Sequence, residues 1–249
     1  MDPCVRRLAQ ERTEVKLKPI ENQVAVVMGA SSGIGRETAL RLAKRGAKVV
    51  VAARSEAGLR SLVDEIGEFS GEAMAAVADV SEFEQVEAVA QIAVEEYGRL
   101  DTWVHLATAG LFAPFDQTEP EEFRRVVDVD LMGQVYGAMA ALPRIKREGS
   151  GALVHISSVV GKRSAPLQSA YSASKHGIDG FLESLRVELL QEGGTASASP
   201  MSFRRPLTRR SLPRLAPSWA SSPRGSRRSI SRGSWLMRFS TALRRRPGR

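Results

Sequence analysis

The sequence has little cysteine and histidine and no long apolar run. Its one cysteine, Cys4, excludes an intramolecular disulfide framework and a zinc site built from cysteines. The three histidines, His105, His155 and His176, are too scattered along the chain to predict a metal centre. No apolar run reaches the roughly 18 residues of a membrane-spanning helix, and the N-terminus lacks the apolar stretch of a signal peptide. A reducing, cytoplasmic setting without a membrane is therefore expected.

Acidic residues are absent from the last part of the chain. All 28 Asp and Glu lie in residues 1–192 beside 22 Lys and Arg, which gives that part a net charge of −6. Residues 193–249 hold 14 Arg and no acid, so they carry +14 and account for the net charge of +8. This Arg-, Ser- and Pro-rich segment lacks the apolar alternation of strands. We therefore expect an N-terminal extension at 1–20, a domain at 21–192 and a tail at 193–249 that is disordered or frame-shifted.

Short apolar runs alternate with amphipathic segments through the acidic body. The runs predict buried strands at 24–28, 49–53, 73–78, 103–107 and 152–156. Helices are predicted between them, with capping-box patterns at Ser81 and Glu84 and at Thr118 and Glu121; the latter opens a long helix ending near Pro143. This alternation predicts an α/β fold with a Rossmann-type, doubly wound parallel sheet. Ligands of such sheets bind beyond the carboxyl ends of the strands.

A glycine-rich turn follows the first predicted strand and leads into a helix. Its sequence is Gly29-Ala30-Ser31-Ser32-Gly33-Ile34-Gly35. Small residues let backbone N–H groups approach a pyrophosphate, and the helix N-terminus adds partial positive charge there. An ordinary tight turn could also use three glycines. The context favours a dinucleotide held by Gly29, Ser31, Ser32, Gly33, Ile34 and Gly35.

Residues after the second and third predicted strands bear on the choice of cofactor. An acid after the second strand would bind the ribose 2′-hydroxyl of NAD, but this chain has Arg54 there and Arg36 after the last glycine. Two cations and no acid favour NADP(H) and leave NAD(H) possible, unless both arginines are solvated surface charges. Asp79 and Val80 end the third strand, where the Asp79 carboxylate either accepts from the adenine amine or is an ordinary turn residue.

Tyr171 and Lys175 share one face of a predicted helix. An ammonium group favours the phenolate, so Lys175 is expected to lower the pKa of Tyr171. The tyrosine could then exchange a proton with an alcohol or a carbonyl while a hydride moves to or from nicotinamide. Ser158, at the end of the fifth predicted strand, could hold the substrate oxygen.

With these motifs, residues 20–192 resemble a short-chain dehydrogenase/reductase. The resemblance implies a Rossmann-type fold and the NAD(P)-dependent interconversion of small-molecule alcohols and carbonyls. It assigns Ser158 to substrate positioning, Tyr171 to acid/base catalysis, and Lys175 to tuning Tyr171 and binding the nicotinamide ribose. It also implies a homodimer or homotetramer formed through helices at 120–145 and 171–191. The matching segments are Met28 to Gly35, Asp79-Val80, Gly98 to Asp101, Ile156-Ser157-Ser158 and Tyr171 to Lys175.

The chain departs from the family pattern at several positions. Met28 replaces a usual Thr, and His105 replaces the first usual Asn after the fourth strand, where we expect a structural role. Asp130 aligns with the Asn of the family's proton relay, so it is a catalytic candidate that adds negative charge beside Lys175. Nothing in 193–249 resembles the family's last strands, so the sheet is expected to lack them. The alternatives are a catalytically impaired NADP(H)-binding protein and a nucleic-acid binder acting through its Arg-rich tail.

Overall fold

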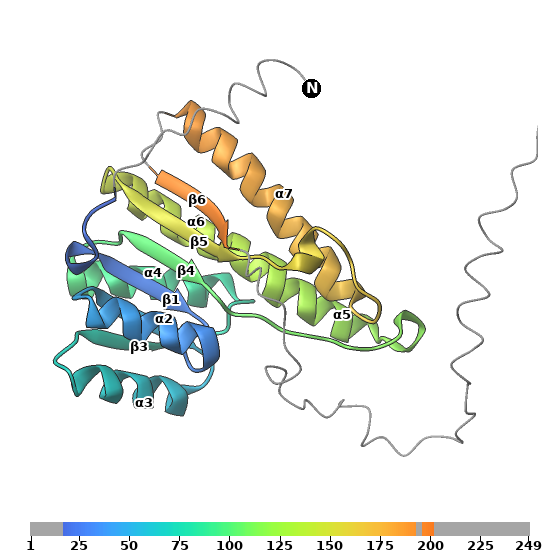
Figure 1. Cartoon of the computed structure of the whole chain (residues 1–249), viewed down its shortest axis with the longest axis horizontal. Helices are drawn as coiled ribbons and strands as arrows, with labels where there is room; N and C mark the ends of the chain where they lie inside the picture. The colour runs from blue at the N-terminus through green and yellow to red at the C-terminus, as the bar shows by residue number, and fades with distance from the viewer. Residues whose placement is uncertain (1–16, 193–195, 202–249) are drawn as a thin grey trace, which may run out of the picture. The chain divides into compact units, whose positions relative to one another are not determined.

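The computed structural model describes residues 17–192 and 196–201. These residues form one six-stranded sheet in the order β3-β2-β1-β4-β5-β6, and all neighbouring strands are parallel (Figure 1). The chain order reverses between β1 and β4, so a crevice opens where their carboxyl ends diverge. The strands are β1 (Val24–Met28), β2 (Lys48–Ala53), β3 (Ala73–Val77), β4 (Thr102–His105), β5 (Gly151–Ile156) and β6 (Ala196–Met201).

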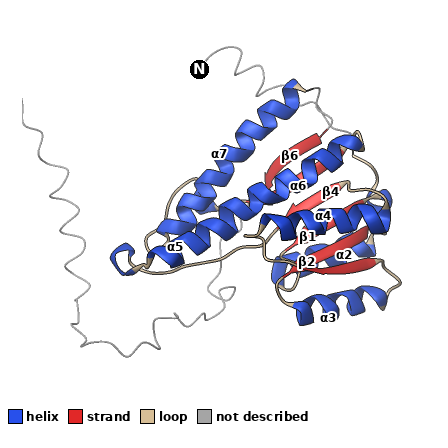
Figure 2. Ribbon diagram, turned by 180° about the vertical axis from the view of Figure 1, so that it is seen from behind, coloured by secondary structure: helices blue, strands red, loops and turns tan. Residues whose placement is uncertain are grey.

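The described part of the chain has six α-helices, and all of them except α5, which packs against α7, cover the two faces of the sheet. Helices α2 and α3 pack on the face of β1 to β3, and α4, α6 and α7 pack on the opposite face (Figures 1 and 2). The helices are α2 (Gly33–Lys44), α3 (Glu56–Gly67), α4 (Phe83–Tyr97), α5 (Pro120–Val127), α6 (Gly133–Arg147) and α7 (Ser169–Gln191).

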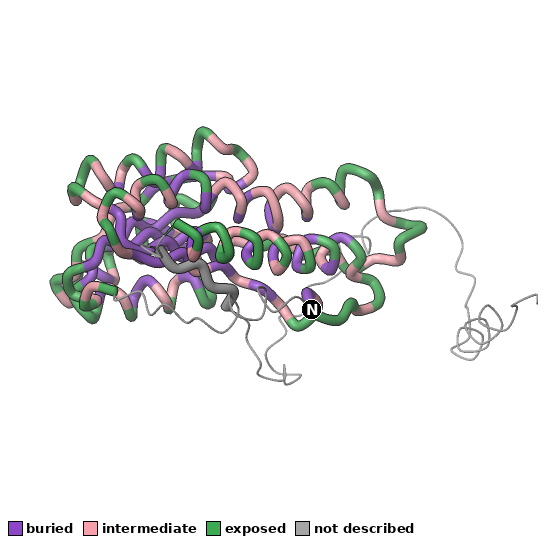
Figure 3. The backbone as a smooth tube through the Cα atoms, turned by 90° about the horizontal axis from the view of Figure 1, so that it is seen from above, coloured by how far each residue is buried: buried purple, intermediate pink, exposed green. Residues whose placement is uncertain are grey.

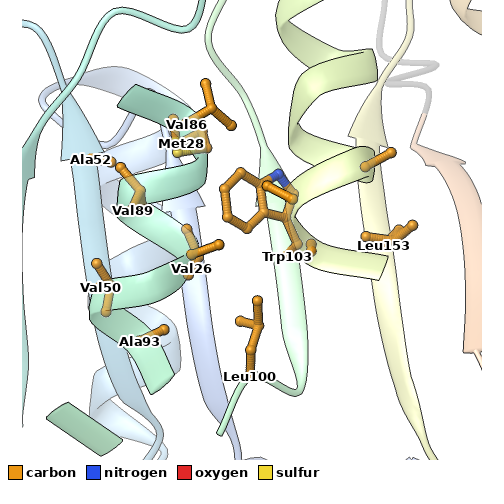
Figure 4. Close-up of a cluster of buried hydrophobic side chains, with 14 of the residues drawn as sticks. Val26, Met28, Val50, Ala52, Val86, Val89, Ala93, Leu100, Trp103 and Leu153 are labelled. Atoms are coloured by element: carbon orange, nitrogen blue, oxygen red, sulfur yellow. The ribbon is translucent and has the colours of Figure 1, made fainter. Parts of the chain in front are cut away.

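Each face of the sheet has its own hydrophobic layer. Trp103 is fully buried in the layer beneath α4 and α6, together with Val26 and Leu100 (Figure 4). In the other layer Leu59 and Leu62 of α3 are fully buried. All residues of β1 are buried, and Figure 3 shows buried residues gathered in the interior of the described part of the chain. Burial on both faces explains why these strands are continuous apolar runs in the sequence.

The five predicted strands are present at the expected places, and the predicted α/β fold is confirmed. The long helix expected from 118 to 143 is different, because it consists of α5, a π-helical segment (Asp128–Met132) and α6. Pro143 lies inside α6 and does not end it. A π-helical segment widens the helix by one residue per turn, which the apolar periodicity of the sequence does not reveal.

Both predicted capping boxes are wrong in detail. Helix α4 begins at Phe83, and the hydroxyl of Ser81 instead donates to Asp79 Oδ1 (2.8 Å). Helix α5 does have a capping box, but its partners are Glu119 and Glu122, one residue later than expected. Pro120 at the first helical position explains the shift, since its ring fixes the backbone angle that starts a helix.

The sheet extends further than the sequence predicted. Strand β6 pairs along its whole length with β5, from Gly151 opposite Ala196 to Ile156 opposite Met201. The expectations of a tail starting at residue 193 and of a sheet without further strands are therefore corrected. Backbone hydrogen bonds at the edge of β5 stabilise this strand although it has no β-branched residue. The remainder of the predicted tail, 202–249, lies outside the described residues.

The folded body also begins earlier than the predicted boundary at residue 21. Lys18 Nζ donates to the carboxylate of Asp101 (2.7 Å), which is itself buried and accepts from the backbone N–H of Val24 (2.9 Å). The side chain of Gln23 donates to the carbonyl of Lys18 (2.6 Å). These bonds fasten the segment before β1 to the amino ends of the strands. Residues 1–16 of the predicted extension lie outside the described residues.

Candidate active site

A cleft of about 580 Å³ lies at the carboxyl ends of the strands. Its walls come from the turn after β1, the ends of β2, β3, β4 and β5, and helices α5 and α7. The topology therefore joins residues that are far apart in the sequence. The predicted site residues that line the cleft are Gly29, Ser31, Ser32, Gly33, Ile34, Gly35, Arg54, Asp79, Val80, Tyr171 and Lys175.

The glycine turn is shaped to let a ligand approach the backbone. Gly29 has φ +81°, and a Cβ there would lie 2.5 Å from the backbone nitrogen of Ala107, so the turn packs against the segment after β4. A Cβ on Gly35 would lie 2.1 Å from the carbonyl oxygen of Gly29. Gly33 has φ +56°, and a Cβ there would meet no atom within 4 Å. Two glycines thus serve close packing, whereas Gly33 borders open space.

Helix α2 begins at this turn without a side-chain cap. Its N-cap residue is Ser32, whose side chain makes no capping hydrogen bond. The first N–H groups of a helix have no partner within the helix and carry partial positive charge. The start of α2 therefore offers unpaired N–H groups to a ligand, and the predicted binding of a pyrophosphate there stays a prediction.

The structure separates the two arginines that were expected to share one role. Arg54 is exposed and lines the cleft just after β2. Arg36 does not line it, because its guanidinium donates to the carbonyl of Gly58 (3.2 Å) and to Glu65 Oε2 (2.6 Å). Arg36 thus connects α2 to α3, and its guanidinium is held by α3 and not by the cleft lining.

Asp79 lies in a polar cluster whose second member the sequence did not suggest. Its carboxylate accepts from the guanidinium of Arg125 on α5 (2.8 Å) and from the hydroxyl of Ser81 (2.8 Å). Arg125 also donates to the Ser81 hydroxyl (2.8 Å). Burial alone would raise the pKa of Asp79, but the hydrogen bonds from Arg125 and Ser81 outweigh it and hold the pKa below its ordinary value. No local sequence signal links Arg125 to Asp79, because α4 and β4 lie between β3 and α5 in the chain and only the fold brings the two residues together.

Tyr171 and Lys175 both line the cleft. Lys175 is fully buried, its ammonium donates to the carbonyl of Ile156 (3.2 Å), and Nζ lies 5.3 Å from the centre of the Tyr171 ring. Burial lowers the pKa of Lys175, although the carboxylates of Asp130 and Asp179 oppose this. The hydrogen bond to the end of β5 fixes the ammonium beside the phenol, as the spacing of the two residues predicted.

The pKa of Tyr171 does not move in the expected direction. Burial raises it above its ordinary value, a hydrogen bond with Ser158 opposes this, and the negative charge of Asp130 adds to the rise. A hydrogen bond with Thr108 also opposes it. The expectation of a lowered pKa was based on Lys175 alone. In the structure the pKa of the phenol depends on burial and on Ser158, Asp130 and Thr108.

Asp130 lies in the π-helical segment and is fully buried. Its Oδ1 accepts from the backbone N–H of Ala109 (2.9 Å) and lies 4.0 Å from Lys175 Nζ. Burial raises the pKa of this carboxyl, while the ammonium of Lys175 and hydrogen bonds from Thr108 and Ala109 oppose the rise. The structure therefore brings Asp130 to Lys175, as the sequence predicted.

Ser158 and its neighbour Ser157 begin the segment after β5. The Ser158 hydroxyl accepts from the backbone N–H of Val160 (3.4 Å) and interacts with the Tyr171 phenol. Ser157 is buried and donates to Asp179 Oδ1 on α7 (2.7 Å). The sequence missed Asp179, which follows Lys175 by one helical turn and holds the Ser157-Ser158 segment against α7.

His105 and His155 form a buried pair beneath α6 and α7. They are opposite each other on β4 and β5, their ring centres are 6.0 Å apart, and both are fully buried. Burial and the charge of Lys175 lower the pKa of His155 to about 3, and burial lowers that of His105 well below its ordinary value. Both rings are therefore neutral, which agrees with the structural role expected for His105. Among residues 17–192 and 196–201, no cluster of His, Cys, Asp and Glu could hold a metal ion.

Comparison with known proteins identifies the family of this chain. A family model described as short chain dehydrogenase matches residues 23–199. The chain belongs to the short-chain dehydrogenase family. The match reaches into β6, so the family's sequence pattern continues beyond the predicted boundary at residue 192. None of the helices in the described part of this short-chain dehydrogenase has the length and hydropathy of a membrane span.

Three similar proteins place the chain among oxidoreductases. The uncharacterized oxidoreductase YxnA of Bacillus subtilis is 40% identical over 189 residues, which are 76% of this chain and 53% of that protein. The chain therefore spans about half of that relative. A metagenomic short-chain oxidoreductase solved with NADP has 34% identity and a TM-score of 0.69, covering 72% of this chain and 81% of its own. A short chain dehydrogenase/reductase of Burkholderia phymatum solved with NAD has 29% identity and a TM-score of 0.72, covering 75% and 66%.

Proposed function

We propose that this short-chain dehydrogenase interconverts a small-molecule alcohol and the corresponding carbonyl, with NADP(H) preferred and NAD(H) possible. The observation that carries the proposal is that the Tyr171–Lys175 pair and the glycine turn line one continuous cleft. A proton-exchanging group and a dinucleotide-binding turn are thus parts of the same site. The solved relatives with NADP and with NAD support the choice of cofactor.

The cofactor would supply or accept the hydride, and the residues of the cleft would hold it. The start of α2 and the segment from Gly29 to Gly35 would bind the pyrophosphate. Arg54 would pair with the 2′-phosphate of NADP(H), because it lines the cleft after β2 without an acid beside it. Asp79 and Val80 would border the adenine. Arg36 is not part of this site.

Three residues would act on the substrate oxygen and its proton. Tyr171 exchanges the proton with the alcohol or carbonyl oxygen. Ser158, which interacts with the phenol, holds the same oxygen and stabilises the charge that develops on it. Lys175 is held by the carbonyl of Ile156, binds the nicotinamide ribose as in the family, and stabilises the phenolate. Asp130, beside Lys175, completes this polar network.

The remaining expectations concern partners and location. The two helical stretches expected to form a homodimer or homotetramer contain α5, α6 and α7. We propose such an assembly because the family uses these helices for association. A cytoplasmic location stays a prediction from the low cysteine content.

The test is NADPH oxidation measured over a panel of ketones and aldehydes. The protein is expected to oxidise NADPH with at least one of them, and Tyr171→Phe is expected to lose this activity while still binding NADPH. A protein that binds NADPH but neither reduces any carbonyl with NADPH nor oxidises any alcohol with NADP would contradict the proposal. It would then be a catalytically impaired binding protein.

A further inference from the structure

Lys175 has two acidic neighbours, but these have different surroundings. Asp179 Oδ1 accepts from Ser157 (2.7 Å), and its Oδ2 lies 3.1 Å from Lys162 Nζ. Asp130 Oδ1 accepts from the N–H of Ala109, and the Oδ2 of neither aspartate has a hydrogen-bond partner among the described residues. The charge of Asp179 is therefore shared with a second cation, whereas Asp130 has Lys175 as its one cationic neighbour within 4.0 Å in the described part of the chain.

The backbone fixes Asp130 close to the ammonium. The side chain of Gln134 donates to the carbonyls of both Asp130 (3.1 Å) and Ile156 (3.2 Å). The carbonyl of Ile156 also accepts from Lys175 Nζ (3.2 Å). These bonds join the π-helical segment, the end of β5 and α7 into one unit, so Asp130 and Lys175 cannot easily separate. A carboxylate confined in this way acts on the ammonium and on the adjacent phenol.

Lys175 is the one positively charged group of this cluster that can balance the negative charge of Asp130. The titratable groups around it are Tyr171 and Lys175 on α7, His105 on β4 and His155 on β5, with Asp179 one turn further along α7. Both histidines are neutral because burial lowers their pKa values. The ammonium of Lys175 must therefore stabilise either the carboxylate of Asp130 or a phenolate at Tyr171, and it is the one buried cation available to both among the described residues.

We propose that Asp130 competes with the Tyr171 phenolate for the Lys175 ammonium, keeps Tyr171 protonated at neutral pH, and so prepares this site for carbonyl reduction. In that reaction the carbonyl carbon receives the hydride of NADPH and its oxygen receives the Tyr171 proton. The resulting phenolate regains a proton from water. Alcohol oxidation needs the phenolate at the start, so it begins only at more alkaline pH. The inference rests on the proposed function for its direction, but the competition itself does not.

A tyrosinate titration tests the competition without any substrate. The chain has three tyrosines, Tyr97, Tyr136 and Tyr171, so the absorbance titration of a matched Tyr171→Phe protein is subtracted to isolate Tyr171. Asp130→Asn removes the charge and keeps an oxygen for the N–H of Ala109. We expect the Tyr171 midpoint to fall by about one pH unit in Asp130→Asn, because a like charge beside the phenolate is removed.

Two further variants make the result specific. Asp130→Ala removes the same charge with a different side chain and is expected to shift the midpoint in the same direction. Asp179→Asn is the matched control and is expected to shift it much less, because Asp179 is paired with Lys162. An unchanged or higher midpoint in both Asp130 variants, with native circular dichroism, would overturn the inference.

Turnover then separates this inference from the proposed function. In Asp130→Asn the rate of alcohol oxidation is expected to rise at a lower pH than in the parent, in parallel with the titration. A shifted midpoint in a protein without turnover would leave the competition standing and refute the proposed function. Turnover with an unshifted midpoint would support the function and refute the role of Asp130.

Discussion

The guanidinium of Arg125 on α5 donates to the carboxylate of Asp79 after β3 at 2.8 Å, and the two residues are 46 positions apart in the sequence. This ion pair connects the predicted adenine end of the cleft to the helix that leads into the π-helical segment of Asp130. It also holds the Asp79 carboxyl ionised, since its pKa is below the ordinary value. This ion pair therefore holds α5 against the segment after β3, and both of these line the cleft.

Replacing Arg125 should weaken cofactor binding while the protein stays folded. In Arg125→Met the Asp79 carboxylate loses one donor and gains mobility, and we expect NADPH affinity to fall about fivefold, which corresponds to about 1 kcal/mol. NADPH fluorescence measures this affinity. Arg124→Met is the matched control, because Arg124 is exposed on the same helix. Equal affinities of the two variants would contradict the role given to Arg125.

Arg54 should decide between the two cofactors. Arg54→Ala removes the cation that would pair with the 2′-phosphate, so NADPH affinity is expected to fall about 10- to 100-fold, with NADH affinity nearly unchanged. Arg36→Ala should leave the ratio of affinities as it is and lower the free energy of unfolding by about 1 kcal/mol, because Arg36 bonds to α3. A ratio changed by Arg36→Ala but not by Arg54→Ala would reverse these roles.

The same substitution at two glycines should have different effects. Gly33→Ala puts its methyl group into open space, so we expect a folded protein, destabilised by about 1 kcal/mol because φ is +56°, with weakened NADPH binding. In Gly35→Ala the methyl group would lie 2.1 Å from the carbonyl oxygen of Gly29, so the turn itself must shift and the loss of stability should be larger. Urea unfolding measures the stability of both variants. A Gly35→Ala protein that is more stable than Gly33→Ala would contradict the close contact between residue 35 and the carbonyl of Gly29.

The buried histidine pair should make the fold sensitive to acid. The unfolded pKa of histidine is about 6.5, whereas that of folded His155 is about 3 and that of His105 is also lowered. The stabilisation from keeping these rings neutral is fully present above pH 6.5 and is lost as the pH falls toward 3. The loss approaches about 1.4 kcal/mol per pH unit for each histidine.

Urea unfolding at several pH values checks this expectation. His155→Asn should reduce the loss of stability between pH 6.5 and the folded pKa of about 3, although it also removes packing against His105. His176→Gln is the control, because His176 is exposed on α7. A pH dependence that changes with His176 and not with His155 would show that the buried pair does not determine acid stability.

The sequence predicted those parts of the molecule that depend on local pattern. Buried strands are continuous apolar runs, and the glycine turn and the Tyr171–Lys175 spacing each follow from contacts within one segment. Strand β6 was missed because its stability comes from the edge of β5 and not from its own composition. The capping residues moved by a few positions for a similar reason, since Ser81 bonds to Asp79 and not to the helix.

Electrostatic surroundings could not be predicted in the same way. Arg36 follows the glycine turn and Arg54 follows β2, and both were expected to bind the cofactor, but the guanidinium of Arg36 pairs with Glu65 on α3. The pKa of Tyr171 depends on burial and on Asp130, Ser158 and Thr108 together, so the spacing to Lys175 alone predicted the wrong direction. Such properties need the three-dimensional arrangement of several segments.

The most direct test of the proposed function is the rate of NADPH oxidation by the parent protein and by Tyr171→Phe with the best carbonyl of the panel. Loss of the acid/base group is expected to reduce kcat by about 100-fold or more while NADPH affinity stays within about twofold. This outcome would support Tyr171 as the proton donor in the cleft. An unchanged kcat in Tyr171→Phe would contradict the account.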